Sequence, residues 1–286
     1  MKLEYESLIW SEEQLAKFYE IFCSEPSPYH TDFFCLAARK KYMTETQKKE
    51  INLGDTCMMF KTILKDYDVK KFISKVKQAD AAASFFTDRD GNYIPRSCYT
   101  FYMNVNKTNV LKAVKDFKDQ LNLWDYDLAT TILFNNTTKK ENIGKQIKTV
   151  QNSLLKSFQD PKNVEGPWLD IDCDVGEVSE EFVKELKKTM VGYLSGSDVY
   201  ILRTHGGVHI IFSKELISSY NKHVADVCSK EEMKDRVRTP EKILGFVQSV
   251  FKTFFPLEDI KEIKYNQNMA VPLAGTIVDG VPISIT

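Results

Sequence analysis

The segment Trp168–Asp174 constrains the fold of this chain more than any other stretch of its sequence. Apolar residues and aspartates alternate along it, in the order Trp-Leu-Asp-Ile-Asp-Cys-Asp. Successive side chains of a β-strand point to opposite faces, so the alternation predicts a strand with Asp170, Asp172 and Asp174 on one face. The opposite face is apolar and has to be buried in a core.

Three neighbouring carboxylates on one strand face repel each other, which either raises their pKa values or requires a cation. Ligand sets made only of oxygen suit Mg²⁺ or Mn²⁺. The other interpretation is a strand that runs out into a solvated acidic turn, because Gly176, Glu177 and Glu180 follow it. We interpret Asp174 as the start of that turn, and both interpretations of the row remain open at this point.

The composition is that of an ordinary globular protein, with 43% hydrophobic and 28% charged residues among 286. A net charge of −1 gives no general attraction to polyanions, so binding to nucleic acid would depend on local basic patches. The six cysteines are scattered singly, which predicts no zinc motif. We expect a cytoplasmic protein without a membrane partner, because we find no signal peptide and no apolar run of about 18 residues.

The order of the remaining patterns predicts an α+β protein. From residue 168 onward the patterns indicate a strand, a helix (179–194), two strands (199–202 and 208–212), a helix (239–254) and two strand-like stretches (263–271 and 276–285). This order is a split βαβ plan with a mixed or antiparallel sheet, whose first and third strands are neighbours or near-neighbours.

The first part of the chain is expected to form an N-terminal α/β module. A capping box at Ser11–Gln14 opens an amphipathic helix, and a strand at 97–105 precedes a helix at 108–121. We place this module at residues 1–160 and the split βαβ module at 161–286, the two together forming one composite domain.

A second group of polar residues lies in the segment Arg203–His209. Gly206 and Gly207 permit a tight turn and a close approach of a ligand to the backbone. His209 begins an apolar strand and could be a buried, hydrogen-bonded core residue. Beside Arg203, Thr204 and open backbone amides, it instead indicates a corner that binds an anion such as a triphosphate. A phosphate site and a metal site in one fold indicate phosphoryl or nucleotidyl transfer.

Three motifs, in this order, resemble the archaeo-eukaryotic primase superfamily. Leu169–Asp172 is similar to its apolar run ending in Asp-x-Asp, and Gly207–His209 to its small-x-His motif. The longer Arg-Thr-x-Gly-Gly-x-His form looks like phage and plasmid primase-polymerases. Pro272–Thr276 resembles the Pro-Gly-Thr box of those cores. The resemblance covers about residues 168–286 and implies an RRM-like catalytic module.

The family's third motif, an apolar residue followed by an acid, is irregular in this chain. Alignment puts Lys264 where the acid belongs, with Glu262 or Asp259 as substitutes after a small shift. Glu262 and Lys264 share a face of the expected strand, which could also be an ordinary exposed edge. The resemblance implies that Asp170 and Asp172 bind two ions, Mg²⁺ or Mn²⁺, with Glu262 as the third ligand.

The resemblance also implies the activity, which is template-dependent joining of nucleoside triphosphates on single-stranded DNA by a primase or primase-polymerase. The residues implied to bind the triphosphate are Arg203, Thr204 and His209. The residues that could bind template phosphates are Arg39, Lys40 and Lys41, although an exposed basic helix face explains them equally well.

Two other functions remain open. A non-catalytic replication subunit that binds nucleotide or nucleic acid would agree with the irregular third motif. A metal-dependent phosphoesterase or nicking enzyme would use His205 and His209. The chain has no P-loop motif, so a helicase partner would be a separate chain.

Overall fold

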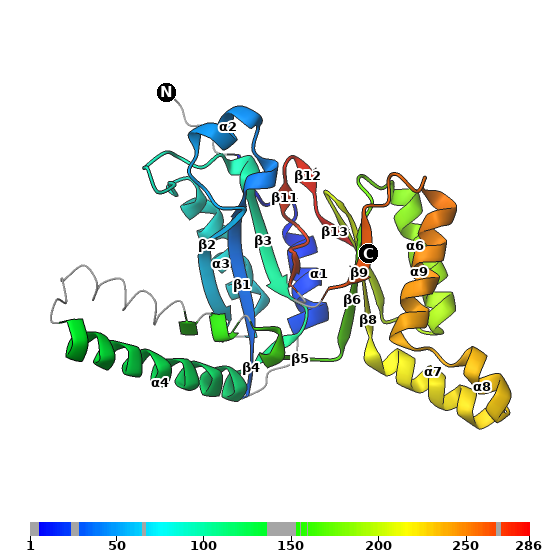
Figure 1. Cartoon of the computed structure of the whole chain (residues 1–286). Helices are drawn as coiled ribbons and strands as arrows, with labels where there is room; N and C mark the ends of the chain where they lie inside the picture. The colour runs from blue at the N-terminus through cyan, green and yellow to red at the C-terminus, as the bar shows by residue number, and fades with distance from the viewer. Residues whose placement is uncertain are drawn as a thin grey trace.

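The computed structural model describes residues 6–23, 29–64, 67–135, 153–154, 156–158, 160–266 and 270–286. It contains both helices and antiparallel sheets, which confirms the α+β class (Figure 1). The helices are α1 (Glu12–Cys23), α2 (Glu45–Glu50), α3 (Val69–Ala83), α4 (Val110–Asn135), α6 (Glu180–Leu194), α7 (Lys214–Val227), α8 (Lys230–Arg236) and α9 (Pro240–Phe254). Short 3-10 turns lie at Lys40–Tyr42, Arg96–Cys98 and Pro161–Asn163.

The first sheet is built around the long strand β1 (His30–Arg39). Its strand order is β10-β3-β1-β4-β5, and β2 pairs with β1 outside this path. The other bounds are β2 (Thr56–Leu64), β3 (Tyr99–Asn104), β4 (Lys107–Asn109), β5 (Val164–Glu165) and β10 (Ala270–Pro272). Phe34 and Leu36 of β1 pack with α1 and α3 in a large apolar core, so the alternate residues of β1 face the other way.

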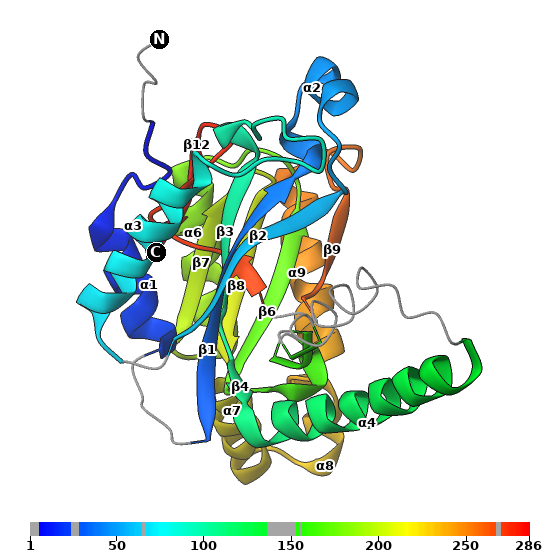
Figure 2. The same cartoon turned by 90° about the vertical axis from the view of Figure 1, so that its left-hand side faces the viewer.

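The second sheet contains the acidic strand β6 (Trp168–Asp174). Its order is β13-β7-β8-β6-β9, with every neighbouring pair antiparallel. The other bounds are β7 (Val199–Thr204), β8 (Gly207–Ser213), β9 (Glu262–Tyr265) and β13 (Ser284–Ile285). The predicted strands at 168–174 and 208–212 are hydrogen-bonded neighbours. Helices α6 and α9 cover the outer face, and the inner face looks toward β1 and β3 (Figures 1 and 2).

The core on the outer face explains why the apolar half of β6 is buried. Ile171 and Cys173 are fully buried there with residues of α6 and α9. The aspartates alternate with them and therefore lie on the inner face, between the two sheets. The predicted alternation of β6 is thus confirmed at the level of the strand and its faces.

The end of the chain contributes to both sheets. β10 pairs with β3 of the first sheet, whereas β13 pairs with β7 of the second. Between them, the hairpin β11 (Ile277–Val278) and β12 (Val281–Pro282) pairs with itself. A boundary at residue 160 therefore does not separate the two sheets, since residues 270–272 complete the first one.

Two details differ from the sequence-based expectation. Ser11 Oγ accepts a hydrogen bond from the backbone N–H of Gln14 at 3.2 Å, as an N-cap should. The Gln14 side chain does not return this bond; its Oε1 accepts from the backbone N–H of Ile285 at 2.8 Å. Helices α7 and α8 were not predicted, because their mostly polar sequences bury only Val224.

Asp32 on β1 is a buried carboxylate with an unusual environment. It is 1% exposed, and the charge of Lys107 and a hydrogen bond with the thiol of Cys23 only partly offset the effect of this burial on its pKa. Burial raises the pKa of Asp32 to about 7. The folded protein therefore keeps this proton over a pH range in which the unfolded chain has already released it.

We expect Asp32→Asn to stabilise the protein increasingly as the pH rises. The raised pKa makes the parent lose stability between about pH 4 and pH 7, whereas an amide does not titrate. The advantage of the variant in unfolding free energy should grow by about 2 kcal/mol from pH 5 to pH 8. Urea unfolding at both pH values measures it, and a pH-independent difference would contradict the assignment.

Candidate active site

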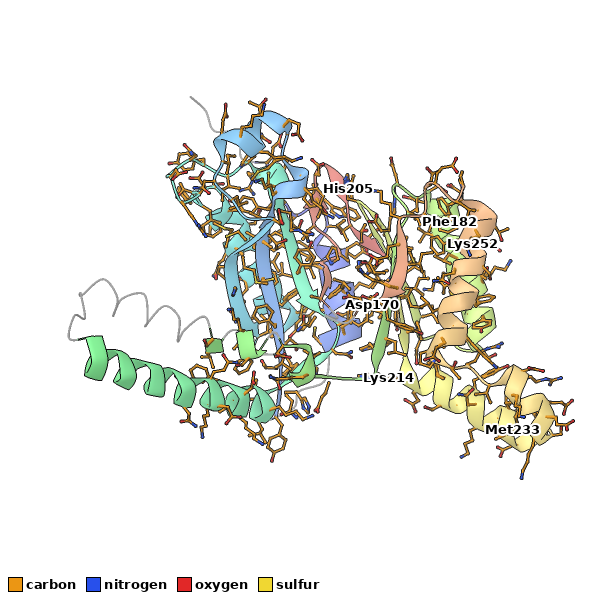
Figure 3. All side chains as sticks on the ribbon, viewed as in Figure 1. Asp170, Phe182, His205, Lys214, Met233 and Lys252 are labelled. Atoms are coloured by element: carbon orange, nitrogen blue, oxygen red, sulfur yellow. The ribbon has the colours of Figure 1, made fainter. Side chains whose placement is uncertain are left out.

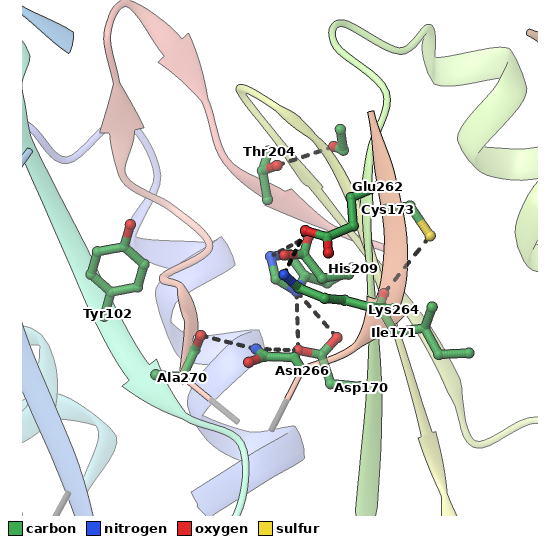
Figure 4. Close-up of polar contacts among 12 residues, drawn as sticks. Tyr102, Asp170, Ile171, Cys173, Thr204, His209, Glu262, Lys264, Asn266 and Ala270 are labelled. Carbon is green, nitrogen blue, oxygen red and sulfur yellow. Dashed lines mark hydrogen bonds and ion pairs between the residues drawn. The ribbon is translucent and has the colours of Figure 1, made fainter. Parts of the chain in front are cut away.

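The inner face of the second sheet carries a row of acidic residues on β6, flanked by polar residues on both neighbouring strands. His209 of β8 and Lys264 of β9 are the register partners of Asp172, on either side of it. Opposite residues of an antiparallel pair share a face, so all three side chains lie on the inner face. Figure 3 places Asp170 between the two sheets, and Figure 4 shows the polar contacts around it.

Asp170 is fully buried and forms a closed hydrogen-bond group with His209 and Asn266. Its two carboxylate oxygens lie 3.1 and 3.0 Å from Nδ1 of His209, which donates to them. Nδ2 of Asn266 donates to Oδ2 of Asp170 at 2.7 Å and to the carbonyl of Ala270 at 3.2 Å. The oxygens of Asp170 are therefore already occupied by protein donors.

His209 is held by this contact with its second nitrogen directed toward Asp172. Nε2 of His209 lies 3.7 Å from Oδ1 of Asp172. Burial lowers the pKa of His209, but the charge and hydrogen bond of Asp170, together with the charge of Asp172, outweigh burial and raise it. A protonated imidazole with one N–H fixed by a buried carboxylate presents the other N–H to a ligand.

Asp172 is the more open carboxylate of the predicted pair, with 40% of its side chain exposed. Partial burial raises its pKa, and the charges of Asp170 and Asp174 raise it further. The charges of His209 and Lys264 act in the opposite direction. Asp172 lies between the other two aspartates of the row, and the charges of both raise its pKa.

The predicted third ligand is not beside Asp172. The register of β9 puts Lys264 opposite Asp172 and Glu262 opposite Asp174. Nζ of Lys264 lies 2.5 Å from Oε2 of Glu262, so this carboxylate is paired with an ammonium group. The alignment placed Lys264 at the acid position, and the strand register agrees with that placement. The register of β9 is not shifted, so Glu262 does not take the position opposite Asp172.

We expect Lys264→Met to strengthen binding of Mn²⁺ by about fivefold. At close range a unit charge contributes about 1 kcal/mol even in water, and removing this ammonium leaves the acidic row less neutralised. Isothermal titration with Mn²⁺ measures the change. Lys252→Met is the control, because Lys252 is exposed on α9, on the far side of the sheet (Figure 3). Unchanged or weaker binding by Lys264→Met would contradict the prediction.

A cavity of about 210 Å³ opens in front of the acidic row. Asp172, Asp174 and His209 line one wall, and the turn of Thr204 and Gly206 lines its end. Asp174 belongs to β6 and faces the cavity, which differs from our interpretation of it as the start of a turn. The row of carboxylates therefore ends inside a cavity rather than in solvent.

The opposite wall of this cavity comes from the first sheet. Arg39, Lys41 and Tyr42 line it, together with Tyr102 of β3. A guanidinium N–H of Arg39 donates to the hydroxyl of Tyr102. The pKa of Lys41 is lowered, because burial and the charge of Arg39 outweigh the opposing charges of Asp174 and Asp172. The cavity thus has acids on one side and cations on the other.

Arg203 does not belong to this cavity. It is one residue from Thr204 on β7, so its side chain lies on the outer face of the sheet. Its guanidinium lies 3.9 Å from Glu177 and 3.8 Å from Glu180. Thr204 does line the cavity, and its Oγ1 donates to the carbonyl of Gly207 at 3.2 Å. Strand alternation therefore excludes Arg203 from the predicted anion corner but keeps Thr204.

Gly207 brings β8 close to β6 at the base of this turn. Its φ is +146°, and a Cβ built on it would lie 2.0 Å from the carbonyl oxygen of Cys173. Only glycine fits this approach. The glycine pair was predicted for contact with a ligand, and the structure gives one of the two glycines a packing role instead.

Two residues that line the cavity had no individual role in the sequence-based prediction of the site: Tyr102 and Asn266. Asn266 lies in the segment after β9, and its pairing with Asp170 has no local signal. His205 faces the same cavity, with Nε2 lying 3.9 Å from Oδ2 of Asp279 and Nδ1 without a partner among the described residues. The sequence assigned His205 only to the alternative of a phosphoesterase or nicking enzyme.

The donor set fits a divalent cation at the open end of the row. The side chains of Asp172 and Asp174 are 40% and 46% exposed, and both line the cavity. Burial raises the pKa of Asp172 and the charges of Asp170 and Asp174 add to it, so a cation between Asp172 and Asp174 would stabilise the charged form. The described residues contain no preformed group of three His, Cys, Asp or Glu donors. Phosphate and water oxygens would complete the six positions that Mg²⁺ prefers.

A second, basic cavity of about 420 Å³ adjoins the first through shared residues Arg39 and Lys41. Lys40 and Lys48 also line it. All three residues predicted to contact template phosphates therefore lie along one wall next to the acidic site.

Among the described helices, none is both long enough and apolar enough to cross a membrane. Comparison of the chain with known protein families, with curated proteins and with solved structures found no match.

Proposed function

We propose that this protein is a template-dependent nucleotidyltransferase, a DNA primase or primase-polymerase that joins nucleoside triphosphates on single-stranded DNA. The observation that carries the proposal is the meeting of Asp170, Asp172 and His209 beside one cavity whose other wall bears Arg39 and Lys41. Acids that can bind a cation and cations that can bind phosphates are the two requirements of phosphoryl chemistry.

In this proposal the chain's own groups orient a triphosphate between the two walls. Asp172 and Asp174 would hold Mg²⁺ or Mn²⁺, which supplies charge stabilisation to the attacking 3′-oxygen and the leaving pyrophosphate when bound. Asp170 raises the pKa of His209, which favours its charged form, and Nε2 of His209 would donate to a phosphate oxygen. Arg39 and Lys41 would bind the phosphates from the opposite wall.

The test is an extension assay with a single-stranded template, a labelled primer, nucleoside triphosphates and Mn²⁺. We expect template-directed products from the parent protein and none when Asp170 and Asp172 are both replaced by alanine. Absence of product with ribo- and deoxyribonucleotides, with and without a primer, would reject the proposal.

A non-catalytic subunit that binds nucleotide is the second candidate. The observation that favours it is Lys264, whose ammonium lies where the resemblance leads us to expect a metal-binding acid. Tight nucleotide binding without incorporation under any metal would support this candidate over the enzyme.

We expect the double variant Lys40→Ala, Lys48→Ala to weaken binding of single-stranded DNA about tenfold. Both lysines line the basic cavity beside the site, and each phosphate contact contributes to affinity through release of counterions. The slope of log affinity against log salt concentration should become less steep, by an amount that corresponds to about one to two phosphate contacts. Fluorescence anisotropy at several salt concentrations measures both effects, with Lys230→Ala, Lys234→Ala on α8 as the control.

A further inference from the structure

A groove of about 380 Å³ runs along the first sheet and joins the cavity in front of the acidic row. The two spaces share the walls formed by Arg39, Tyr102, Asn266 and Ala270. A molecule with a polyanionic end and a second, different end could therefore occupy both at once. The groove has the size of a small-molecule site.

The walls of the groove are mainly apolar and come from neighbouring strands. Phe33, Cys35 and Ala37 alternate along β1 and lie on the face of β1 that turns away from the α1–α3 core. Met58 of β2 and Tyr102 of β3 flank them. Small residues at the floor between larger apolar and aromatic walls leave a space into which a flat ring fits.

Tyr102 stands at the junction of the two spaces and is held in place. The hydroxyl of Tyr102 accepts from Arg39, and the guanidinium carbon of Arg39 lies 5.7 Å from the Tyr102 ring centre. Figure 4 shows Tyr102 across from Asp170 and His209. The ring thus separates an apolar space from a charged one, and Arg39 faces both.

Asn104 of β3 places a side-chain amide in the groove. It is 4% exposed and lines the groove, and its side-chain amide makes no hydrogen bond to any residue that the structure describes. Because Asn104 lines the groove, its amide is available to a ligand there. An amide offers one acceptor and two donors, which match the edge of a nucleobase or the hydroxyls of a sugar.

We propose that the groove binds the nucleoside part of a nucleotide whose phosphates lie in the cavity of the acidic row, with Asn104 hydrogen bonded to the nucleoside. This inference rests on the proposed function in taking a nucleotide as the ligand. The ring lies among Phe33, Met58 and Tyr102, and the phosphates extend past Arg39 toward His209. Asn104 then contributes to the selection of the base or the sugar.

The experiment compares nucleoside triphosphates with inorganic tripolyphosphate by isothermal titration in the presence of Mn²⁺, without template. We expect the parent to bind at least one nucleoside triphosphate about tenfold or more tighter than tripolyphosphate. Asn104→Leu should weaken that nucleotide about tenfold, a typical effect of one lost hydrogen bond to a buried group, and leave tripolyphosphate unchanged. Retained tripolyphosphate binding also shows that the variant is folded.

Thr100→Val is the matched control. Thr100 is buried on the same face of β3, next to Tyr102, but it does not line the groove. This variant should bind both ligands like the parent. Titration with ribo- and deoxyribonucleoside triphosphates of the different bases shows whether Asn104 contacts the base or the sugar.

Equal affinity of the parent for nucleotide and tripolyphosphate would reject the proposal that the groove binds the nucleoside. An equal loss of affinity for both ligands in Asn104→Leu would also reject it. If neither the nucleotide nor tripolyphosphate bound, the binding role of the groove would be rejected together with the proposed function. Nucleotide-selective binding that depends on Asn104, without any extension of a primer, would reject the polymerase activity and support the groove.

Discussion

Asp172→Asn is expected to reduce nucleotide incorporation by about 1,000-fold or more, which corresponds to roughly 4 kcal/mol of transition-state stabilisation. Asp172 is one of the two partly exposed carboxylates of the row. It lines the cavity and lies between His209 and Lys264. An amide keeps the shape of the side chain but removes the charge that a divalent ion requires. Single-turnover extension of a labelled primer measures the loss.

The fold of this variant should be intact, because the side chain is partly exposed and its charge is disfavoured by burial and by the charges of Asp170 and Asp174. Its unfolding free energy should therefore be equal to or slightly above that of the parent. Asp198→Asn, in an exposed loop before β7, is the control and should retain full activity. Activity of Asp172→Asn within tenfold of the parent would refute a catalytic role for the row.

Asp170→Ala is expected to lower the unfolding free energy by about 3 kcal/mol, in addition to its effect on activity. The carboxylate is fully buried and accepts hydrogen bonds from His209 and Asn266. Its removal leaves the buried imidazole of His209 without its acceptor and takes one of two acceptors from the half-buried amide of Asn266. Urea unfolding measures the loss, and the slope of the transition should stay the same.

The difference between the parent and Asp170→Ala should depend on pH through His209. Contact with Asp170 raises the pKa of His209 in the folded protein above its unfolded value of about 6.5. The stabilisation is fully present below about pH 6.5 and is lost as the pH rises through the raised pKa of His209. A difference that grows toward alkaline pH would contradict a protonated His209.

The alternation of β6 was predictable because both of its faces have strong requirements. Ile171 and Cys173 are needed in the core against α6 and α9, so the aspartates can only lie on the inner face. Helix α9 was equally predictable, since Thr239 caps it and Pro240 occupies its first turn. These signals are local, and each depends on a few residues in sequence.

The contacts that build the site are not local, and the sequence could not predict them. The register of β9 on β6 decides that Lys264 rather than Glu262 lies beside Asp172. Packing of the two sheets brings Arg39 and Tyr102 to the same cavity as His209. The exclusion of Arg203 is the instructive error. Residue spacing suggested that it belongs with Thr204, although adjacent residues of a strand point to opposite faces.

The path of the last seventeen residues has a mechanical consequence. One short strand of this stretch is hydrogen bonded into the first sheet and another into the second, and the self-paired hairpin lies between them. The stretch therefore acts as a tether across the mouth of the cavity. Any widening of the cavity would have to stretch this segment or break the pairing of β10 with β3 or of β13 with β7.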